Sequence, residues 1–371
     1  RKLKTLILAC ECEVSNAIND VQEDPNFAAG QKRFIKCLVA IYDRSPGDYL
    51  CVQPGGCPGL VKLVLPRMDD EDGDLADHMT KALANLSKLE ELTGIPMLNS
   101  LAQLQANPDP PETLKLKQLN DIDTYNRRNM PDMENLTKIL SNVKGIELFV
   151  SPNITKAFVE RFKEVNFLKI ELADFHIHIS SFRSLSTLDI GLDFECAWPL
   201  VAALSRCRLQ IQDLTLRNST FKLGQGTEGT RPRIPSLQAV TLIKPSFIEG
   251  AAMRTLVGGC PNLCTIWITL SDDRNYCVDE FTDNLISDIA PHLSNLESFT
   301  AECQYKYNLY NELNCLLTMD AISLLLEHCP KLQTLGQLDC WNITDSDFTQ
   351  LSLQVKIHNW DLKLLQGYEI S

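Results

Sequence analysis

The chain has no concentration of basic residues. Its 371 residues include 35 Lys and Arg against 48 Asp and Glu, a formal net charge of −13 at neutral pH. A protein that binds a phosphate backbone needs a surface dense in Lys and Arg. We therefore expect no nucleic-acid ligand, whereas a basic protein surface would be an acceptable partner by charge complementarity.

The sequence also lacks a long hydrophobic run. No apolar stretch approaches the roughly 18–20 residues that span a bilayer, and no signal-peptide pattern is visible at the start. Apolar residues still make up 44% and charged residues 22% of the chain, the composition of a folded protein. We expect a folded chain with no membrane partner. Because the sequence starts without Met and inside a repeat, we also expect it to lack its natural N-terminal segment.

Paired cysteine motifs are absent although the chain has 14 cysteines. No Cys-x-x-Cys pairs with a second such motif or with suitably spaced His residues, which argues against a structural zinc site. Disulfide frameworks are typical of smaller and denser secreted domains. Cys57, Cys260 and Cys329 instead each precede Pro at equivalent points of a repeat. Free Cys behaves as a small buried apolar residue, so we predict reduced cysteines, no metal, no cofactor, and a cytoplasmic or nuclear location.

Signals of catalysis are missing too. The GxGxxG motif at 224–229 is followed by TRPRIP, whose prolines exclude the helix that a dinucleotide site requires. The acidic segment 68–74 does not fit the register of a calcium loop. No nucleophile stands beside a base at a recognisable spacing, so we predict that the protein is not an enzyme.

A leucine pattern of the form LxxLxL repeats along the chain. It fits, with other apolar residues substituting, Leu3-Leu6-Leu8, Leu60-Leu63-Leu65, Val143-Ile146-Leu148, Phe167-Ile170-Leu172, Leu185-Leu188-Ile190, Ile211-Leu214-Leu216, Leu237-Val240-Leu242 and Leu263-Ile266-Ile268. Leu296-Phe299-Ala301 is a weaker match, and Leu89-Leu92, Leu116-Leu119 and Leu332-Leu335 are partial ones. The first positions 185, 211, 237 and 263 are each 26 residues apart. A period held over four copies indicates a repeat array.

Helical spacing of apolar residues fills the second half of most repeats. It appears in 74–86, 133–140, 154–165, 251–257, 279–293 and 319–329, and Asp74, Asn153 and Asp345 stand where helix N-caps are expected. We predict a right-handed α/β leucine-rich repeat solenoid (a horseshoe) of about a dozen strand-plus-helix turns, forming one domain over residues 1–371. Stacked leucines would supply a continuous core that no single turn could bury alone.

One repeat carries a family resemblance. CPKLQTLGQLDCWNITDSDFTQL (329–351) resembles the cysteine-containing leucine-rich repeat, whose pattern is CPxLxxLxLxxCxxITDxxxxxL, and CPNLCTIWITL (260–270) resembles its first half. This repeat is typical of F-box leucine-rich repeat proteins, the substrate receptors of cullin–RING ubiquitin ligases. The resemblance implies a protein-binding function, with Skp1 and cullin engaged through an F-box. No F-box is recognisable in this sequence.

A candidate binding surface lies where the repeat lengthens. Strand residues beside the inward leucines should form a mixed, mildly acidic concave face, and Trp267 stands out there among small polar residues. It is either an interface anchor or local cover over neighbouring strands. First positions 263, 296 and 332 are 33 and 36 residues apart, so two successive turns carry insertions just after their strands. These insertions hold Asp272, Asp273, Arg274, Tyr276, Tyr305, Lys306, Tyr307 and Tyr310. They are either tolerated loops or, with their tyrosines, a binding rim beside Trp267.

Three functions remain open. The first is the substrate-binding part of an F-box-type ubiquitin ligase receptor. The second is a repeat-only scaffold or inhibitor without an F-box. The third is a secreted recognition receptor that uses Asn-x-Ser/Thr sequons and some cysteine pairs.

Overall fold

The computed structural model describes residues 5–7, 61–64, 80, 83–84, 86–93, 116–123, 142–149, 164–170, 182–192, 196–207, 209–223, 232–270, 281–303 and 315–365. The chain separates into two compact units, Arg1–Leu168 and Lys169–Ser371, and each is described by itself. The prediction of a single domain over residues 1–371 stays a prediction.

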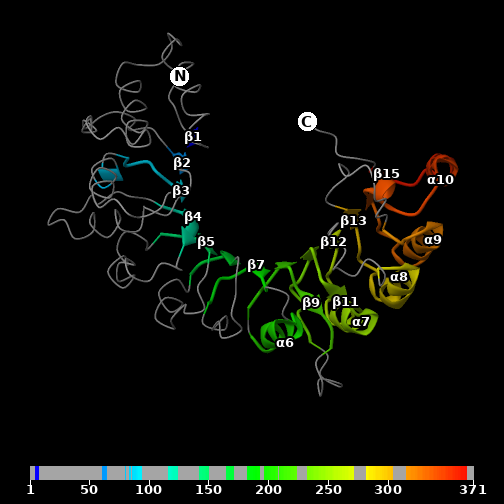
Figure 1. The fold of residues 1–371 in the computed structure, drawn as a ribbon, viewed down its shortest axis with the longest axis horizontal. Helices are drawn as coiled ribbons and strands as arrows, with labels where there is room; N and C mark the ends of the chain where they lie inside the picture. Colours follow the sequence, from blue (N-terminus) through cyan, green and yellow to red (C-terminus); the bar gives the residue numbers. More distant parts are fainter. Residues whose placement is uncertain are drawn as a thin grey trace, which may run out of the picture. The chain divides into compact units, whose positions relative to one another are not determined.

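The first unit contains parallel strands that pair in the order of the sequence. They are β1 (Thr5–Ile7), β2 (Lys62–Val64), β3 (Glu91–Thr93), β4 (Gln118–Asp123) and β5 (Gly145–Phe149) (Figure 1). The register stacks Leu63, Leu92, Leu119 and Ile146, which are all buried. The opposite face of the strands carries an ion pair between Lys62 and Glu91, with 2.8 Å from Nζ to Oε2.

The second unit contains a longer parallel sheet. Its strands are, in order, β7 (Thr187–Gly191), β8 (Asp213–Arg217), β10 (Ala239–Ile243), β12 (Thr265–Leu270), β13 (Ser298–Cys303), β14 (Thr334–Gly336) and β15 (Lys363–Leu364). A separate two-stranded sheet joins β9 (Thr220–Phe221) to β11 (Phe247–Ile248). The helices are α6 (Trp198–Arg206), α7 (Gly250–Gly258), α8 (Asp283–Ile289), α9 (Met319–His328) and α10 (Asp345–Ile357), with 3-10 turns η3 (Ala290–His292) and η4 (Leu338–Cys340).

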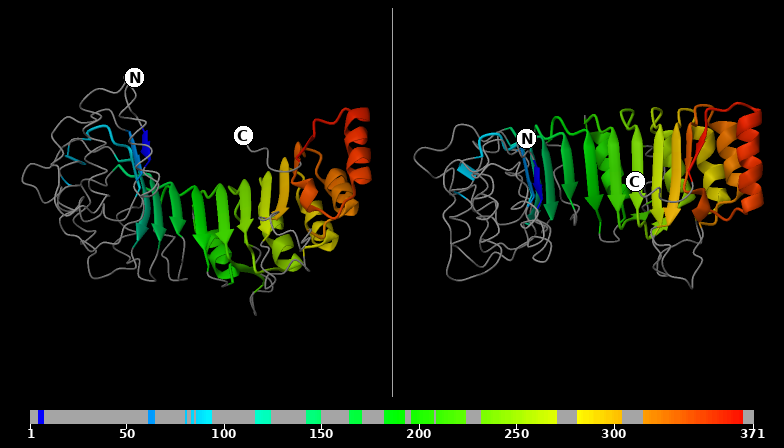
Figure 2. Two further views of the ribbon diagram at one scale, coloured as in Figure 1. Left: turned by 45° about the horizontal axis from the view of Figure 1, so that its top comes forward. Right: turned by 90° about the horizontal axis from the view of Figure 1, so that it is seen from above.

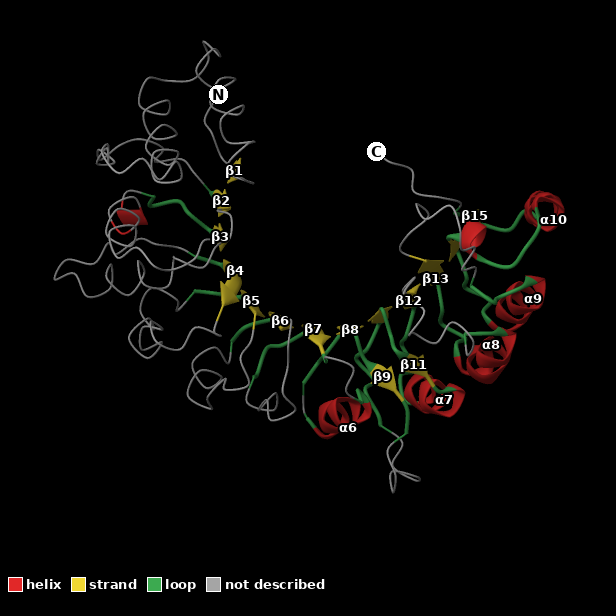
Figure 3. Cartoon of the chain, in the orientation of Figure 1, coloured by secondary structure: helices red, strands yellow, loops and turns green. Residues whose placement is uncertain are grey.

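Within the second unit the helices lie along one side of the row of strands (Figures 2 and 3). One parallel strand recurs per turn, and paired residues such as Leu214 and Val240 are 26 positions apart. This arrangement is a leucine-rich repeat solenoid, which confirms the predicted fold class.

The core of the second unit consists of two stacked columns of apolar side chains. One column contains Leu188, Leu214, Val240, Ile266, Phe299 and Leu335, and the other contains Ile190, Leu216, Leu242, Ile268 and Ala301. All of them are almost inaccessible to solvent. Burying a side chain of this size contributes about 1.5–3 kcal/mol, so the columns hold neighbouring turns together.

Two aromatic pairs complete this core on its helical side. Trp198 packs edge-on against Phe221, with ring centroids 6.1 Å apart, and Phe299 packs in the same way against Trp341 at 6.0 Å. The Trp341 Nε1–H donates a hydrogen bond to the Ala301 carbonyl oxygen at 3.1 Å, so the indole is buried without leaving its polar atom unsatisfied.

Side-chain hydrogen bonds also connect successive turns before their strands begin. The Asn262 amide donates to the Pro235 carbonyl oxygen at 2.8 Å, and the Asn295 amide donates to that of Pro261 at 2.7 Å. In the next turn Lys331 takes this position, and its Nζ donates to Asn295 Oδ1 at 2.8 Å.

Strand β6 (Phe167–Ile170), at the boundary of the two units, corrects one predicted register. Leu168 and Ile170 are buried, whereas Phe167 is half-buried on the other face. The inward pattern therefore starts at Val165, which is fully buried, and not at Phe167. The predicted pattern was therefore displaced by two residues, and because side chains alternate along a strand, this shift keeps Ile170 on the inward face.

The helices agree with the sequence in part. Segment 251–257 lies within α7, segment 279–293 contains α8 with η3, and segment 319–329 contains α9, so these predictions are confirmed. The N-cap prediction for Asp345 is wrong: Thr344 caps α10 in a capping box, in which its side chain accepts from the Asp347 N–H. Asp345 is the first helical residue instead. The pattern also missed α6. Asp74, Asn153, the segment 133–140 and residues 154–163 lie outside the described residues.

The eight cysteines within the described residues are all free thiols, and Cys260, Cys315, Cys329 and Cys340 are buried. Burial raises the pKa of Cys260 and of Cys315 to about 12 and that of Cys329 to about 11. Two causes raise the pKa of Cys303: the larger is its hydrogen bond with the Cys340 thiol, and the second is burial. Thiols in such surroundings stay protonated at neutral pH and are poor nucleophiles.

Candidate protein-binding surface

The outward face of the sheet in the second unit is built mostly from small side chains. The register places Thr187, Asp213, Ala239, Thr265, Ser298 and Thr334 in one row across the strands. The next row contains Asp189, Thr215, Thr241, Trp267, Thr300 and Gly336. The result is a low surface of hydroxyl and methyl groups from which one large side chain projects.

That large side chain is Trp267, in the middle of β12. Its direct neighbours in the register are Thr241 on β10 and Thr300 on β13. The residue is 43% exposed, while Ile266 and Ile268 on either side of it are fully buried in the core. Trp267 therefore belongs to the outward face of the sheet. An exposed aromatic side chain above small neighbours has the composition of an interface anchor.

Charged groups on this face are largely held by neighbours. Arg217 makes a bidentate contact with Asp189, with 2.7 Å from Nε to Oδ1 and 2.6 Å from Nη2 to Oδ2. Asp213 accepts a hydrogen bond from the Thr187 hydroxyl at 3.1 Å, and Glu302 accepts one from the buried Thr269 hydroxyl at 2.9 Å. Arg217 thus balances Asp189, and Lys363 of β15 stands beside Thr334 in the first row, so the mildly acidic character of this face stays a prediction.

The other eight predicted site residues lie outside the described residues. They are Asp272, Asp273, Arg274, Tyr276, Tyr305, Lys306, Tyr307 and Tyr310. The structure does describe where their two segments begin, because β12 ends at Leu270, β13 ends at Cys303, and these two residues are partners in the register. Both segments therefore leave the sheet from adjacent points. A rim that joins their tyrosines to Trp267 stays a prediction.

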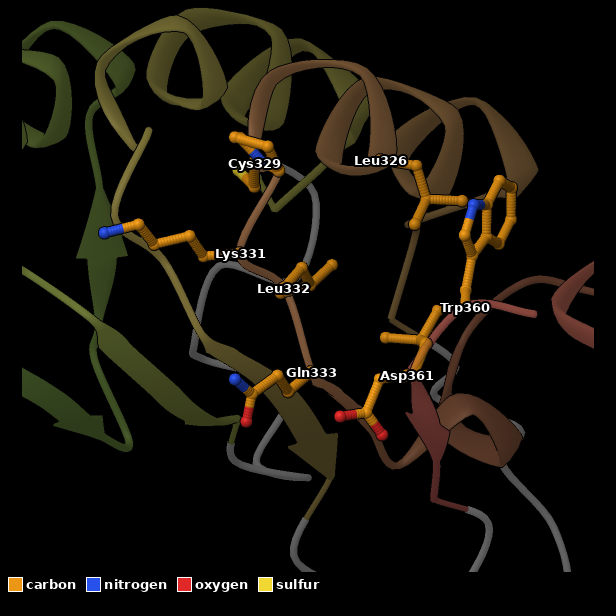
Figure 4. A pocket seen from close by; sticks show the side chains of 9 residues that line it. Leu326, Cys329, Lys331, Leu332, Gln333, Trp360 and Asp361 are labelled. Atoms are coloured by element: carbon orange, nitrogen blue, oxygen red, sulfur yellow. The ribbon is translucent and has the colours of Figure 1, made fainter. Parts of the chain in front are cut away.

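Sequence reasoning missed a second surface feature, a groove of about 340 Å³ near Trp360. Figure 4 shows its lining, which comes from the C-terminal end of α9, the segment before β14 and the segment before β15. The repeat pattern gave no reason to expect it, because the HNWD sequence at 358–361 matches no part of the repeat. The only sequence signal was a Trp among polar residues.

Neither metal-binding clusters nor membrane-spanning helices occur in the described ranges. No group of three or more His, Cys, Asp or Glu there is placed to hold a metal ion. The helices of the same ranges are all too short or too polar to cross a bilayer.

No protein-family model matches the chain, and no curated protein matches it in sequence. Solved structures do match. A chain of the yeast Rad7–Elc1 complex is 13% identical, with 97% of this chain and 88% of that chain covered and a TM-score of 0.38. An internalin of Listeria monocytogenes is 14% identical, with 77% of this chain and 82% of that chain covered and a TM-score of 0.38. A chain of the Drosophila Toll–Spatzle complex is 12% identical, with 82% of this chain and 43% of that chain covered and a TM-score of 0.39. Likeness at this level carries no information about what this chain binds.

Proposed function

We propose that the chain is a non-catalytic protein-binding module and forms the substrate-recognition part of an F-box-type ubiquitin ligase receptor. The observation that carries the binding role is Trp267, a tryptophan that is 43% exposed at the centre of a strand in a parallel sheet. In the isolated protein the exposed part of the ring contributes no favourable free energy of burial. A partner that covers the ring supplies that free energy.

The ligase assignment rests on the resemblance of the repeat at 329–351 to the cysteine-containing type. Local structure is consistent with that resemblance: Cys329 and Cys340 are both buried, and helix α10 starts directly after Thr344 in the Ile-Thr-Asp segment. A receptor of this kind would contact Skp1 and cullin through an F-box outside these repeats and would work in the cytoplasm or nucleus.

The binding role can be tested with substitutions at the predicted anchor. Wild-type protein is compared in pull-downs from lysate with Trp267→Ala and with a variant that carries Trp267, Tyr305, Tyr307 and Tyr310 all as Ala. Truncating a true anchor costs about 2 kcal/mol or more of binding, which is about a 30-fold loss of affinity. The matched control is Leu353→Ala, which truncates another exposed apolar side chain, 54% exposed, on α10.

Partners that bind the wild type and the Leu353 variant but not the Trp267 variants would support the proposal. Unchanged partners and affinities with an intact fold would place the binding surface elsewhere. A partner whose capture requires Trp267 can then be titrated against each variant to measure the loss of affinity directly.

Two alternatives are separated from the ligase assignment by other measurements. Association of the full-length protein with Skp1 distinguishes a ligase receptor from a scaffold or inhibitor that consists of repeats only. A thiol count on denatured protein tests the secreted receptor. Reduced cysteines should give a count near fourteen, and several disulfides would overturn the cytoplasmic or nuclear assignment.

A further inference from the structure

The groove near Trp360 has an apolar wall and floor. Leu326, on the last turns of α9, lies beside the Trp360 indole in Figure 4. Leu332 and Leu362 also line the groove, and each is only 8% exposed. Trp360 itself is 41% exposed, so this wall offers apolar surface to solvent.

Trp360 is held in place although it is exposed. Its ring stacks on the His358 imidazole with centroids 5.0 Å apart and an angle of 20° between the planes. The His358 ring nitrogen Nε2 is 3.0 Å from Gln354 Oε1. The backbone N–H of Trp360 donates a hydrogen bond to the Val355 carbonyl oxygen at 3.0 Å. A ring fixed in this way loses little conformational entropy when a ligand packs on it.

The groove has a polar, acidic end. Asp361 and Gln333 lie there, across the groove from Trp360 and Leu326 (Figure 4). Lys331 also lines the groove, but its Nζ is bonded to Asn295 Oδ1 at 2.8 Å and points away from Asp361.

We propose that this groove binds a cationic side chain, Arg or Lys, from a protein partner. The alkyl stem lies on Trp360, Leu326 and Leu332, and the charged head meets Asp361 and the Gln333 amide oxygen. Arg and Lys are the side chains that combine an apolar stem with a cationic tip, and a guanidinium matches the geometry of a carboxylate. Asp361 and Gln333 are both exposed, so a cationic head can reach them from solvent, whereas a neutral apolar side chain would make no charge-assisted contact with the Asp361 carboxylate.

This inference rests on the proposed protein-binding function and names the chemistry of a contact away from Trp267. It is consistent with the net charge of −13, which favours approach of basic partners.

The experiment uses the four tryptophans of the chain as reporters. Protein labelled with 5-fluorotryptophan gives separate fluorine resonances for buried Trp198 and Trp341 and for exposed Trp267 and Trp360, and Trp360→Phe assigns the last. The probes are the Nα-acetyl methylamides of arginine and lysine, with those of citrulline and norleucine as neutral analogues. We expect a saturable shift of the Trp360 resonance with the cationic probes and at least five-fold weaker binding of the neutral ones.

Two substitutions complete the test. Asp361→Asn should weaken binding of the arginine probe at least five-fold. The control is Asp320→Asn, which should not change that binding. Asp320 is an exposed acid in the first turn of α9, at the end of the helix opposite the groove. Equal binding of citrulline, an equal response of Trp267, or no effect of Asp361→Asn would overturn the inference. Those outcomes leave the proposed function untouched if Trp267→Ala still loses its partners.

Discussion

Two adjacent glycines at the end of α7 should respond in opposite ways to the same substitution. A Cβ added at Gly259 would overlap the Pro232 carbonyl oxygen and lie 2.9 Å from its carbonyl carbon. A Cβ added at Gly258 would have no other atom within 4 Å. Gly259 has φ −93°, which any residue adopts, so close packing of the backbone and not conformation requires glycine there.

The cost at Gly259 follows from what must move. The Ile234 N–H donates to the Gly259 carbonyl oxygen at 3.1 Å, and the Ile234 side chain is 3% exposed. Relieving the overlap displaces this segment, which gives up a hydrogen bond of about 1 kcal/mol and part of a burial that is worth about 1.5–3 kcal/mol. We expect Gly259→Ala to lower the free energy of unfolding by about 2–4 kcal/mol. Gly258→Ala, at the last residue of α7, should raise it by up to about 0.5 kcal/mol.

Denaturant unfolding of both variants, followed by far-ultraviolet circular dichroism, measures the difference. Because the two positions are neighbours in the same helix end, effects of expression, solubility and overall composition are shared. If Gly259→Ala unfolds at the same denaturant concentration as Gly258→Ala, the close approach of Pro232 to α7 is wrong.

Two further predictions concern the core. Leu214→Asp should lower the free energy of unfolding by roughly 4 kcal/mol or more, since it buries an unpaired carboxylate in the leucine column. Thr241→Asp, on the outward face, should have little effect. A similar loss of stability in the thermal melts of both variants would contradict the assigned faces. Stability should also fall as pH rises from about 9 towards 12, because the buried Cys260 thiol, with its pKa raised from 9.0 to about 12, stays neutral when folded but ionises when unfolded. Cys260→Ala should reduce that loss by about 1.4 kcal/mol per pH unit, and identical slopes of unfolding free energy against pH would rule out this origin.

Much of the architecture could be predicted from the sequence because the repeat is a local pattern. The inward residues of β7, β8, β10, β12 and β13 all agree with the spacing of the leucines. Helices α7, α8 and α9 agree as well, since apolar residues at helical spacing lie between successive strands. The exposed position of Trp267 followed from the alternation of side chains along β12.

Errors arose where two local signals competed. At β6 the aromatic Phe167 resembled the first inward residue of the pattern, yet Val165 occupies that position and Leu168 and Ile170 follow it. At α10 both Thr344 and Asp345 are good N-caps, and the choice of Thr344 depends on its reciprocal bonds with Asp347.

By itself the sequence determined a parallel solenoid, its period and the identity of the leucine columns, because each of these depends on residue type at a fixed spacing. The groove at Trp360 and the requirement for glycine at position 259 were decided only by the tertiary structure. Both depend on how segments from different turns approach one another: Asp361 and Trp360 meet Leu326 and Gln333 across the groove, and Pro232 meets the end of α7. Such approaches are set by packing between turns, which no spacing within a single turn encodes.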